Sequence, residues 1–296
     1  MNVACGYTIP ITLFGIPPKP ADHLKAMEIV GQNGFNAIEL ELYDEFIPEH
    51  RRDLPKMQAI LKQYGMQVPS VMAVEEKMFS LDPAIRRKAI HDYDALSDMT
   101  AALGAPLSAI CGYMPPEIRP VGTELYVGGP PTAVEVGADF SWSAFWQNAV
   151  EVVAEFADIA ASKGLSLIVE TRANDVFSST DAVMNLIHEV NRPNMGVILD
   201  VAHVHAGKEY LALVIPKLGS LIKLVHFSDN DGTMAYHYSF GQGKINFPSV
   251  MRSLKRTGFT GTIVVDISGV PDILVEAVSA RDAIYRWIQT AEESKG

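Results

Sequence analysis

Met195-Gly-Val-Ile-Leu-Asp200 is a short, mostly apolar run that ends in an acidic side chain. Such a composition is typical of a strand buried on both faces of a parallel sheet. Three more runs in the second half of the chain have this form and also end in a carboxylate or an imidazole: Ser166-Leu-Ile-Val-Glu170, Leu221-Ile-Lys-Leu-Val-His226 and Thr262-Ile-Val-Val-Asp266. A charged group at the end of a buried strand costs free energy unless it is paired or binds a cation. Four such groups in one chain point to a single site for a divalent metal.

Short apolar runs alternate with amphipathic helical patterns along the whole chain. Further candidate strands occupy residues 3–7, 36–40, 67–72 and 107–113, and candidate helices occupy 20–33, 54–64, 82–103, 143–163, 182–190 and 273–288. Several helical patterns are followed by a glycine suited to ending a helix, namely Gly34, Gly65, Gly104, Gly164 and Gly258. About eight strand–helix pairs predict one α/β domain over residues 1–296, a (β/α)₈ TIM barrel, with a doubly wound sheet as the competing architecture.

The longest irregular stretch, residues 114–141, follows the fourth predicted strand. It is rich in Pro and Gly and includes Gly128-Gly-Pro-Pro131. In a TIM barrel, a loop after a strand lies on the catalytic face, so this long loop is a candidate substrate lid. A surface excursion or an oligomer contact is an equal alternative.

The composition restricts the classes of partner. The chain has 296 residues, is 48% hydrophobic and carries a net charge of −11, which predicts a large core and no electrostatic footprint for nucleic acid or an anionic membrane. The sequence shows no membrane-length apolar stretch and no signal-peptide pattern, so we expect a cytoplasmic protein. Cys5 and Cys111 lie in apolar runs and are expected to be reduced core residues. Assembly into a homo-oligomer stays open.

Strand alternation makes a specific prediction about the mouth of the barrel. If Glu170 points into the barrel, so does Ile168, while Leu167 and Val169 face the helices. The same alternation groups Asp200 with Ile198, His226 with Leu224, and Asp266 with Val264. Three carboxylates and one imidazole favour a hard or borderline cation. We expect one Mn²⁺, with Mg²⁺, Co²⁺ and Zn²⁺ as alternatives.

Three stretches carry a family likeness: Ile168-Val-Glu170, Gly196-Val-Ile-Leu-Asp-Val-Ala-His203 and His226-Phe-Ser-Asp-Asn-Asp-Gly232. The likeness continues through His237 and Gly241-Gln-Gly-Lys-Ile-Asn246, and an early Gly34-Phe-Asn-Ala-Ile-Glu39 fits a second strand. Together they resemble the xylose isomerase-like TIM-barrel superfamily of sugar (phosphate) isomerases and epimerases. The resemblance implies a metal held by Glu170, Asp200, His226 and the acidic residue of the last strand, and implies that His203 binds substrate or orients a ligand.

Two positions depart from the epimerases of that superfamily. Those enzymes usually have Glu on the last strand, where this chain has Asp266, whose side chain is shorter by about one C–C bond, ~1.5 Å. They also have an arginine soon after the seventh-strand histidine, where this chain reads Ser228-Asp-Asn-Asp-Gly232.

The resemblance implies a sugar isomerase or epimerase that transfers a proton through a metal-stabilised enediolate. A metal bound by adjacent carbonyl and hydroxyl oxygens stabilises the negative charge that develops when the neighbouring C–H loses its proton. Glu170 is the predicted base, and Asp266 and His237 are the other candidates for acid–base catalysis.

Substrate contacts are predicted for His203, Glu39 and Arg172, although Arg172 could instead pair with Asp175. Four further histidines fall in helical or loop patterns and are predicted to lie on the surface: His23, His50, His91 and His188.

Three other functions stay open on the sequence alone. A lyase acting on keto-sugars, either a dehydratase or a C-glycoside-cleaving enzyme, would use the same machinery to expel a β-substituent. An endonuclease IV-like phosphodiesterase would need several metals and would bind DNA. A non-catalytic sugar-binding subunit would not need a complete set of ligands.

Overall fold

The eight main strands form one all-parallel sheet. The computed structural model describes residues 1–120 and 133–293. The strands are β1 (Asn2–Cys5), β2 (Leu40–Tyr43), β3 (Ser70–Val74), β4 (Leu107–Ile110), β7 (Ser166–Glu170), β8 (Met195–Asp200), β9 (Ile222–Phe227) and β10 (Thr262–Val265). Their order is β1-β10-β9-β8-β7-β4-β3-β2. A parallel bridge between Cys5 and Ile38 brings β1 beside the residues before β2. The sheet therefore curls round, and the predicted TIM barrel is confirmed.

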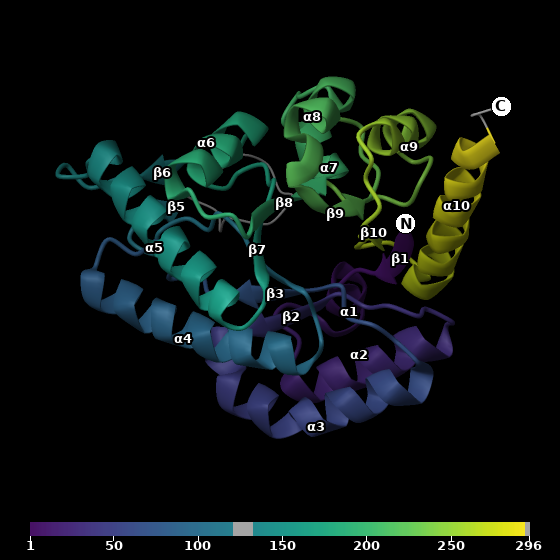
Figure 1. The fold of residues 1–296 in the computed structure, drawn as a ribbon, viewed down its shortest axis with the longest axis horizontal. Coiled ribbons are helices and arrows are strands. Elements are labelled where there is room, and N and C mark those ends of the chain that lie inside the picture. Colours follow the sequence, from purple (N-terminus) through teal and green to yellow (C-terminus); the bar gives the residue numbers. More distant parts are fainter. Residues whose placement is uncertain (121–132, 294–296) are drawn as a thin grey trace.

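Helices surround the strands (Figure 1). They are α1 (Thr8–Phe14), α2 (Pro20–Gln32), α3 (Ile47–Tyr64), α4 (Pro83–Ala102), α5 (Trp142–Ser162), α6 (Thr180–Val190), α7 (Val201–Ala206), α8 (Leu211–Leu218), α9 (Phe247–Arg256) and α10 (Ile273–Glu293), with short 3₁₀ turns η1 (Asp44–Phe46) and η2 (Gly219–Leu221). The five glycines predicted to end helices all have positive φ, which glycine adopts without steric cost. Within the described residues, no helix combines the length and apolar character needed to cross a bilayer.

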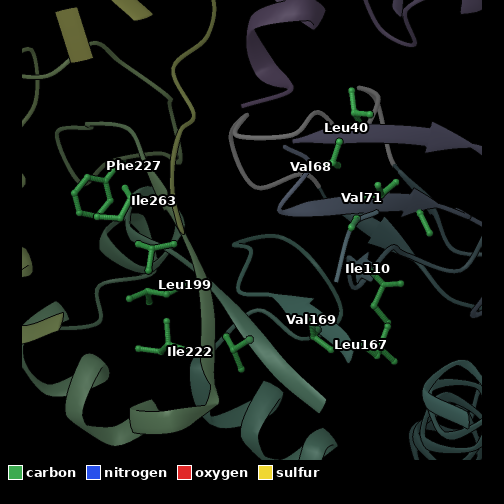
Figure 2. Packing of buried hydrophobic residues seen from close by; sticks show 14 of the residues in the cluster. Leu40, Val68, Val71, Ile110, Leu167, Val169, Leu199, Ile222, Phe227 and Ile263 are labelled. Carbon is green, nitrogen blue, oxygen red and sulfur yellow. The ribbon is translucent and has the colours of Figure 1, made fainter. Parts of the chain in front are cut away.

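Two apolar layers confirm the predicted strand alternation. Ile168, Ile198, Leu224 and Val264 belong to a cluster inside the barrel. Their neighbours along each strand belong to a larger cluster between the strands and the helices, and Figure 2 shows several of these, including Leu167, Val169, Leu199 and Ile263. The parity places Glu170, Asp200, His226 and Asp266 on the inner face.

The predicted bounds of the second and third strands are wrong. Residues 36–39 make only isolated bridges, and regular pairing begins at Leu40 opposite Val71. Ala37 pairs with Gln67, so one extra residue lies on the β3 side before the regular ladder starts. Pro69 lies in this stretch and has no N–H to donate to the ladder, which delays both strands.

The long segment after β4 is confirmed. Within its described part, β5 (Arg119–Pro120) and β6 (Val134–Glu135) form a small antiparallel pair before α5 begins. The Gly128–Pro131 stretch lies outside the described residues. The role of this segment as a substrate lid stays a prediction.

Both cysteines are buried free thiols, as predicted, but the prediction that His23 and His50 lie on the surface is wrong. Each is only 2% exposed. The Tyr7 hydroxyl lies 2.8 Å from His23 Nδ1, and His50 Nε2 accepts the N–H of Tyr43 at 3.2 Å. The two imidazole rings meet edge-on with centroids 5.0 Å apart. Amphipathic periodicity cannot identify a histidine that fills the space between a strand end and two helices.

This buried pair predicts an acid-sensitive fold. Burial lowers the pKa of His23 to about 4, and burial together with the neighbouring His23 lowers that of His50 to about 3, from the ordinary 6.5. Protons therefore bind the unfolded chain more tightly than the folded one between pH about 6.5 and about 3. We expect the free energy of unfolding to fall as the pH drops through this window, and to fall less in a His23→Gln/His50→Gln double variant. Urea unfolding of metal-free protein at several pH values would measure both curves, and parallel curves would contradict the assignment.

Candidate metal centre

The four predicted ligands converge at the carboxyl ends of four neighbouring strands. Glu170 and Asp200 are the last residues of β7 and β8, His226 is the next-to-last residue of β9, and Asp266 directly follows β10. Asp200 and His226 are register partners. All four residues are buried, with 0–7% of each exposed. Parallel strands bring such ends to one rim of the barrel, so the structure gathers the set that the sequence predicted.

His226 lies among the three carboxylates. Its Nδ1 is 2.9 Å from Glu170 Oε1, 3.7 Å from Asp266 Oδ2 and 3.8 Å from Asp200 Oδ2. The ligand atoms offered by Glu170, Asp200 and His226 all lie within 4.8 Å of one another. Three oxygens around one imidazole nitrogen form a compact donor set.

Two orphaned atoms show that this donor set fits a cation. Asp200 Oδ1 accepts the N–H groups of Ala202 and His203, at 2.8 and 3.0 Å, and caps α7. Among the described residues, Asp200 Oδ2 and His226 Nδ1 make no hydrogen bond, although both are buried and Nδ1 lies 2.9 Å from Glu170 Oε1; His226 Nε2 makes no hydrogen bond either. A buried polar atom without a partner is costly, and a divalent ion would satisfy both atoms at once.

Opposite charges at the centre stabilise one another and shift the pKa values of the buried groups. Burial alone would raise the pKa of Glu170, but His226 and Arg172 lower it to about 2. Burial likewise opposes ionisation of Asp200, and the nearby His203 and His226 outweigh it and lower its pKa. Burial would lower the pKa of His226, whereas Glu39, Asp266 and the other carboxylates raise it well above the ordinary value. Glu170 and Asp200 are therefore ionised and able to bind a cation.

Asp266 also belongs to a second group of side chains. Its Oδ2 lies 2.9 Å from His237 Nδ1, and its Oδ1 accepts the hydroxyl of Thr8 at 2.8 Å. Burial opposes protonation of His237, but Asp266 raises its pKa to about 9. The rings of His203 and His237 meet edge-on, 5.2 Å apart. His203, His237 and Asp200 form a further compact trio of donor atoms.

Arg172 lies beside Glu170 at the same rim. Its Nε is 3.6 Å from Asp175 Oδ2 and 3.9 Å from Glu170 Oε2. The guanidinium lies over the ring of Tyr113, 5.5 Å from its centroid. The predicted alternative, pairing with Asp175, is thus present, and the same cation lies next to the candidate base.

Glu39 lies inside the barrel, with its Oε2 2.9 Å from His226 Nε2. Its other oxygen accepts the hydroxyl of Ser70. The substrate contact of Glu39 stays a prediction. The placement of Glu39 next to Nε2 favours a role in holding His226.

Three contacts to these acids come from residues that the sequence analysis missed. Cys111 donates its thiol to Glu170 Oε2 at 3.1 Å, Ser70 binds Glu39, and Thr8 binds Asp266. Ser70 shares its inward parity with Met72, so strand alternation could have indicated it. Cys111 shares the inward parity of Ala109 within the predicted strand 107–113, so alternation could have indicated it too. Thr8 is the first residue of α1, where strand alternation carries no signal.

The backbone beneath Asp266 tolerates no side chain at Gly6. A Cβ at this residue would lie 2.5 Å from the carbonyl oxygen of Val265 and 3.0 Å from Asp266 Oδ1. We expect Gly6→Ala to separate β1 from β10, to lower the free energy of unfolding by about 1–3 kcal/mol and to displace Asp266. Gly137→Ala is the matched control, because its Cβ would meet only the end of the flexible Asp139 side chain. Urea unfolding compares the two, and equal stabilities would contradict the steric argument.

Known proteins resemble this chain over about half of its length or more. A family model described as xylose isomerase-like TIM barrel matches residues 27–290. A ketose 3-epimerase from Arthrobacter globiformis is 22% identical over 268 residues, which cover 89% of this chain and 83% of that enzyme. The uncharacterized protein MJ1311 from Methanocaldococcus jannaschii is 24% identical over 151 residues, but the match spans only 49% of this chain and 50% of that protein.

The fold has close counterparts among solved structures. The crystal structure of a D-tagatose 3-epimerase-like protein superposes with a TM-score of 0.78 at 18% identity and covers all of both chains. Because the family model spans nearly the whole barrel, the chain belongs to the xylose isomerase-like TIM-barrel family.

Proposed function

We propose that this protein is a divalent-metal-dependent sugar isomerase or epimerase that moves a proton on a carbon next to a carbonyl group. The arrangement of three carboxylates around His226 Nδ1 carries the proposal. The similarity to a ketose 3-epimerase along most of the chain supports the substrate class.

Glu170, Asp200, His226 and Asp266 would hold the ion. Mn²⁺ is the expected ion, since the set has three oxygen donors, one nitrogen donor and no thiolate, and Mg²⁺, Co²⁺ or Zn²⁺ are alternatives. When bound, the ion would supply positive charge next to the substrate oxygens and so stabilise the negative charge that proton removal creates.

Glu170 is the proposed base. Its Oε1 faces His226, whereas its Oε2 is held by the thiol of Cys111 and lies 3.9 Å from Arg172 Nε. Its depressed pKa keeps it ionised and able to accept a proton. The hydrogen bond from Cys111 orients the carboxylate, and the charge of Arg172 lies close to it without a hydrogen bond.

Asp266 and His237 form the proposed second acid–base pair. Proton return from the other face of the carbon would invert it, and the raised pKa of His237 supplies a protonated group there at neutral pH. His203 and Arg172 are the proposed contacts to substrate hydroxyl groups.

A lyase acting on keto-sugars is the second candidate. The observation in its favour is that both oxygens of Asp266 are engaged, by Thr8 and by His237. If Asp266 cannot return the proton, removal by Glu170 would end in loss of a β-substituent instead of inversion.

The main experiment follows deuterium incorporation. Ketoses incubated with the Mn²⁺-loaded protein in D₂O should incorporate deuterium at the carbon next to the carbonyl, as NMR would detect. Elimination products from 3-keto sugars without such exchange would favour the lyase. Three bound metal ions per chain and cleavage of DNA would instead favour the phosphodiesterase.

Glu170→Gln tests the base. The amide cannot accept the proton, so we expect the exchange rate to fall by about 10²–10⁴-fold. Glu28→Gln is the matched control, because Glu28 is exposed on α2. A Glu170→Gln variant that kept the parent rate would exclude Glu170 as the base.

A further inference from the structure

We propose that Glu39 is a positioning residue that orients His226 toward the metal, and is not a contact to the substrate. This inference rests on the proposed metal-dependent function. It concerns a side chain from β2's entry segment, on the opposite side of the barrel from the strands that carry Glu170 and Asp200.

The two nitrogens of His226 face opposite sets of oxygens. Nδ1 faces Glu170, Asp200 and Asp266, whereas Nε2 lies 2.9 Å from Glu39 Oε2. A carboxylate next to one imidazole nitrogen holds a proton there, which leaves the lone pair of the other nitrogen for a metal. The contact at Nε2 therefore selects Nδ1 as the ligand atom.

Glu39 is itself held on two sides. Its Oε1 accepts the hydroxyl of Ser70, a fully buried residue of β3. Its backbone N–H donates to the carbonyl of Cys5 at 2.9 Å, beside β1. A chain of buried contacts thus runs from Ser70 through Glu39 to His226, and it fixes the plane of the imidazole.

The burial of Glu39 separates this role from substrate binding. Glu39 is 3% exposed and both of its oxygens have protein partners. Glu41, two residues further along the same strand face, is partly exposed and accepts the hydroxyl of Tyr43 at 2.5 Å instead. The two glutamates differ in their contact with His226, so Glu41 provides a matched control.

The experiment is a calorimetric titration of the metal-free full-length protein with Mn²⁺ alone. We expect Glu39→Gln, which keeps the shape and removes the charge, to raise the Kd for Mn²⁺ by roughly 10–100-fold. Ser70→Ala should raise the Kd in the same direction by a smaller factor. Glu41→Gln should leave the Kd within about twofold of the parent, because Glu41 does not touch His226. Thermal melts of the metal-free variants establish that each is folded, and Ser70→Ala carries the test if Glu39→Gln does not fold.

The possible outcomes can be distinguished from one another. A Glu39→Gln variant that binds Mn²⁺ as tightly as the parent but has a raised KM for the sugar would make Glu39 a substrate contact and overturn the inference. Equal losses in Glu39→Gln and Glu41→Gln would show that the contact with His226 is not what affects metal binding, and would also overturn it. A parent protein that binds no Mn²⁺ would refute the proposed function itself, which is a different result from an unaffected variant of a parent that binds.

Discussion

The rest of the site depends on the contacts between the buried imidazole of His226 and the carboxylates around it. Three carboxylates lie within 4 Å of its Nδ1 and a fourth lies beside its Nε2. So many acids cannot be buried together unless positive charge is supplied, because each isolated buried carboxylate costs several kcal/mol. Protonated His226 supplies one charge without a metal. A divalent ion would supply more, and would engage Asp200 Oδ2, which has no hydrogen-bond donor among the described residues.

The barrel keeps the charged groups apart from its apolar layers. On the four strands that carry the candidate ligands, the inward position below the rim is apolar: Ile168, Ile198, Leu224 and Val264. One step nearer the rim, the same parity presents the ionisable groups. Strand alternation thus forces the ligands onto one face, and the parallel register of β8 and β9 sets Asp200 directly beside His226. Two helices hold the candidate ligands: the first backbone N–H groups of α7 donate to Asp200, and Thr8 at the start of α1 donates its hydroxyl to Asp266.

The barrel and the convergence of the four candidate ligands could be predicted from the sequence because each depends on a local repeating pattern. A run such as Met195–Asp200 carries its parity and its charged end in six consecutive residues. What could not be predicted depends on contacts between residues that lie far apart in the sequence. Glu39 reaches His226 across the barrel, and the thiol of Cys111 reaches Glu170 from 59 residues away. The burial of His23 and His50 likewise depends on how α2 and α3 meet the strand ends. The regular pairing of β2 with β3 begins later than predicted because of a single proline, Pro69. Its missing N–H matters only once the two strands pair.

Asp266 has a shorter side chain than the Glu that the resemblance leads one to expect, yet its carboxylate lies close to His226. Its carboxylate would be expected to fall short of the ligand set by about 1.5 Å relative to Glu. Its Oδ2 nevertheless lies 3.7 Å from His226 Nδ1, as near as that of Asp200 at 3.8 Å. Two contacts hold it there, one from Thr8 at the start of α1 and one from His237 in the loop after β9. The two contacts come from both sides of β10. They fix the direction in which the Asp266 carboxylate points, although they do not make the side chain longer. The position of Asp266 is therefore compatible with metal binding, and its contact with His237 is the one that the proposed proton return would use.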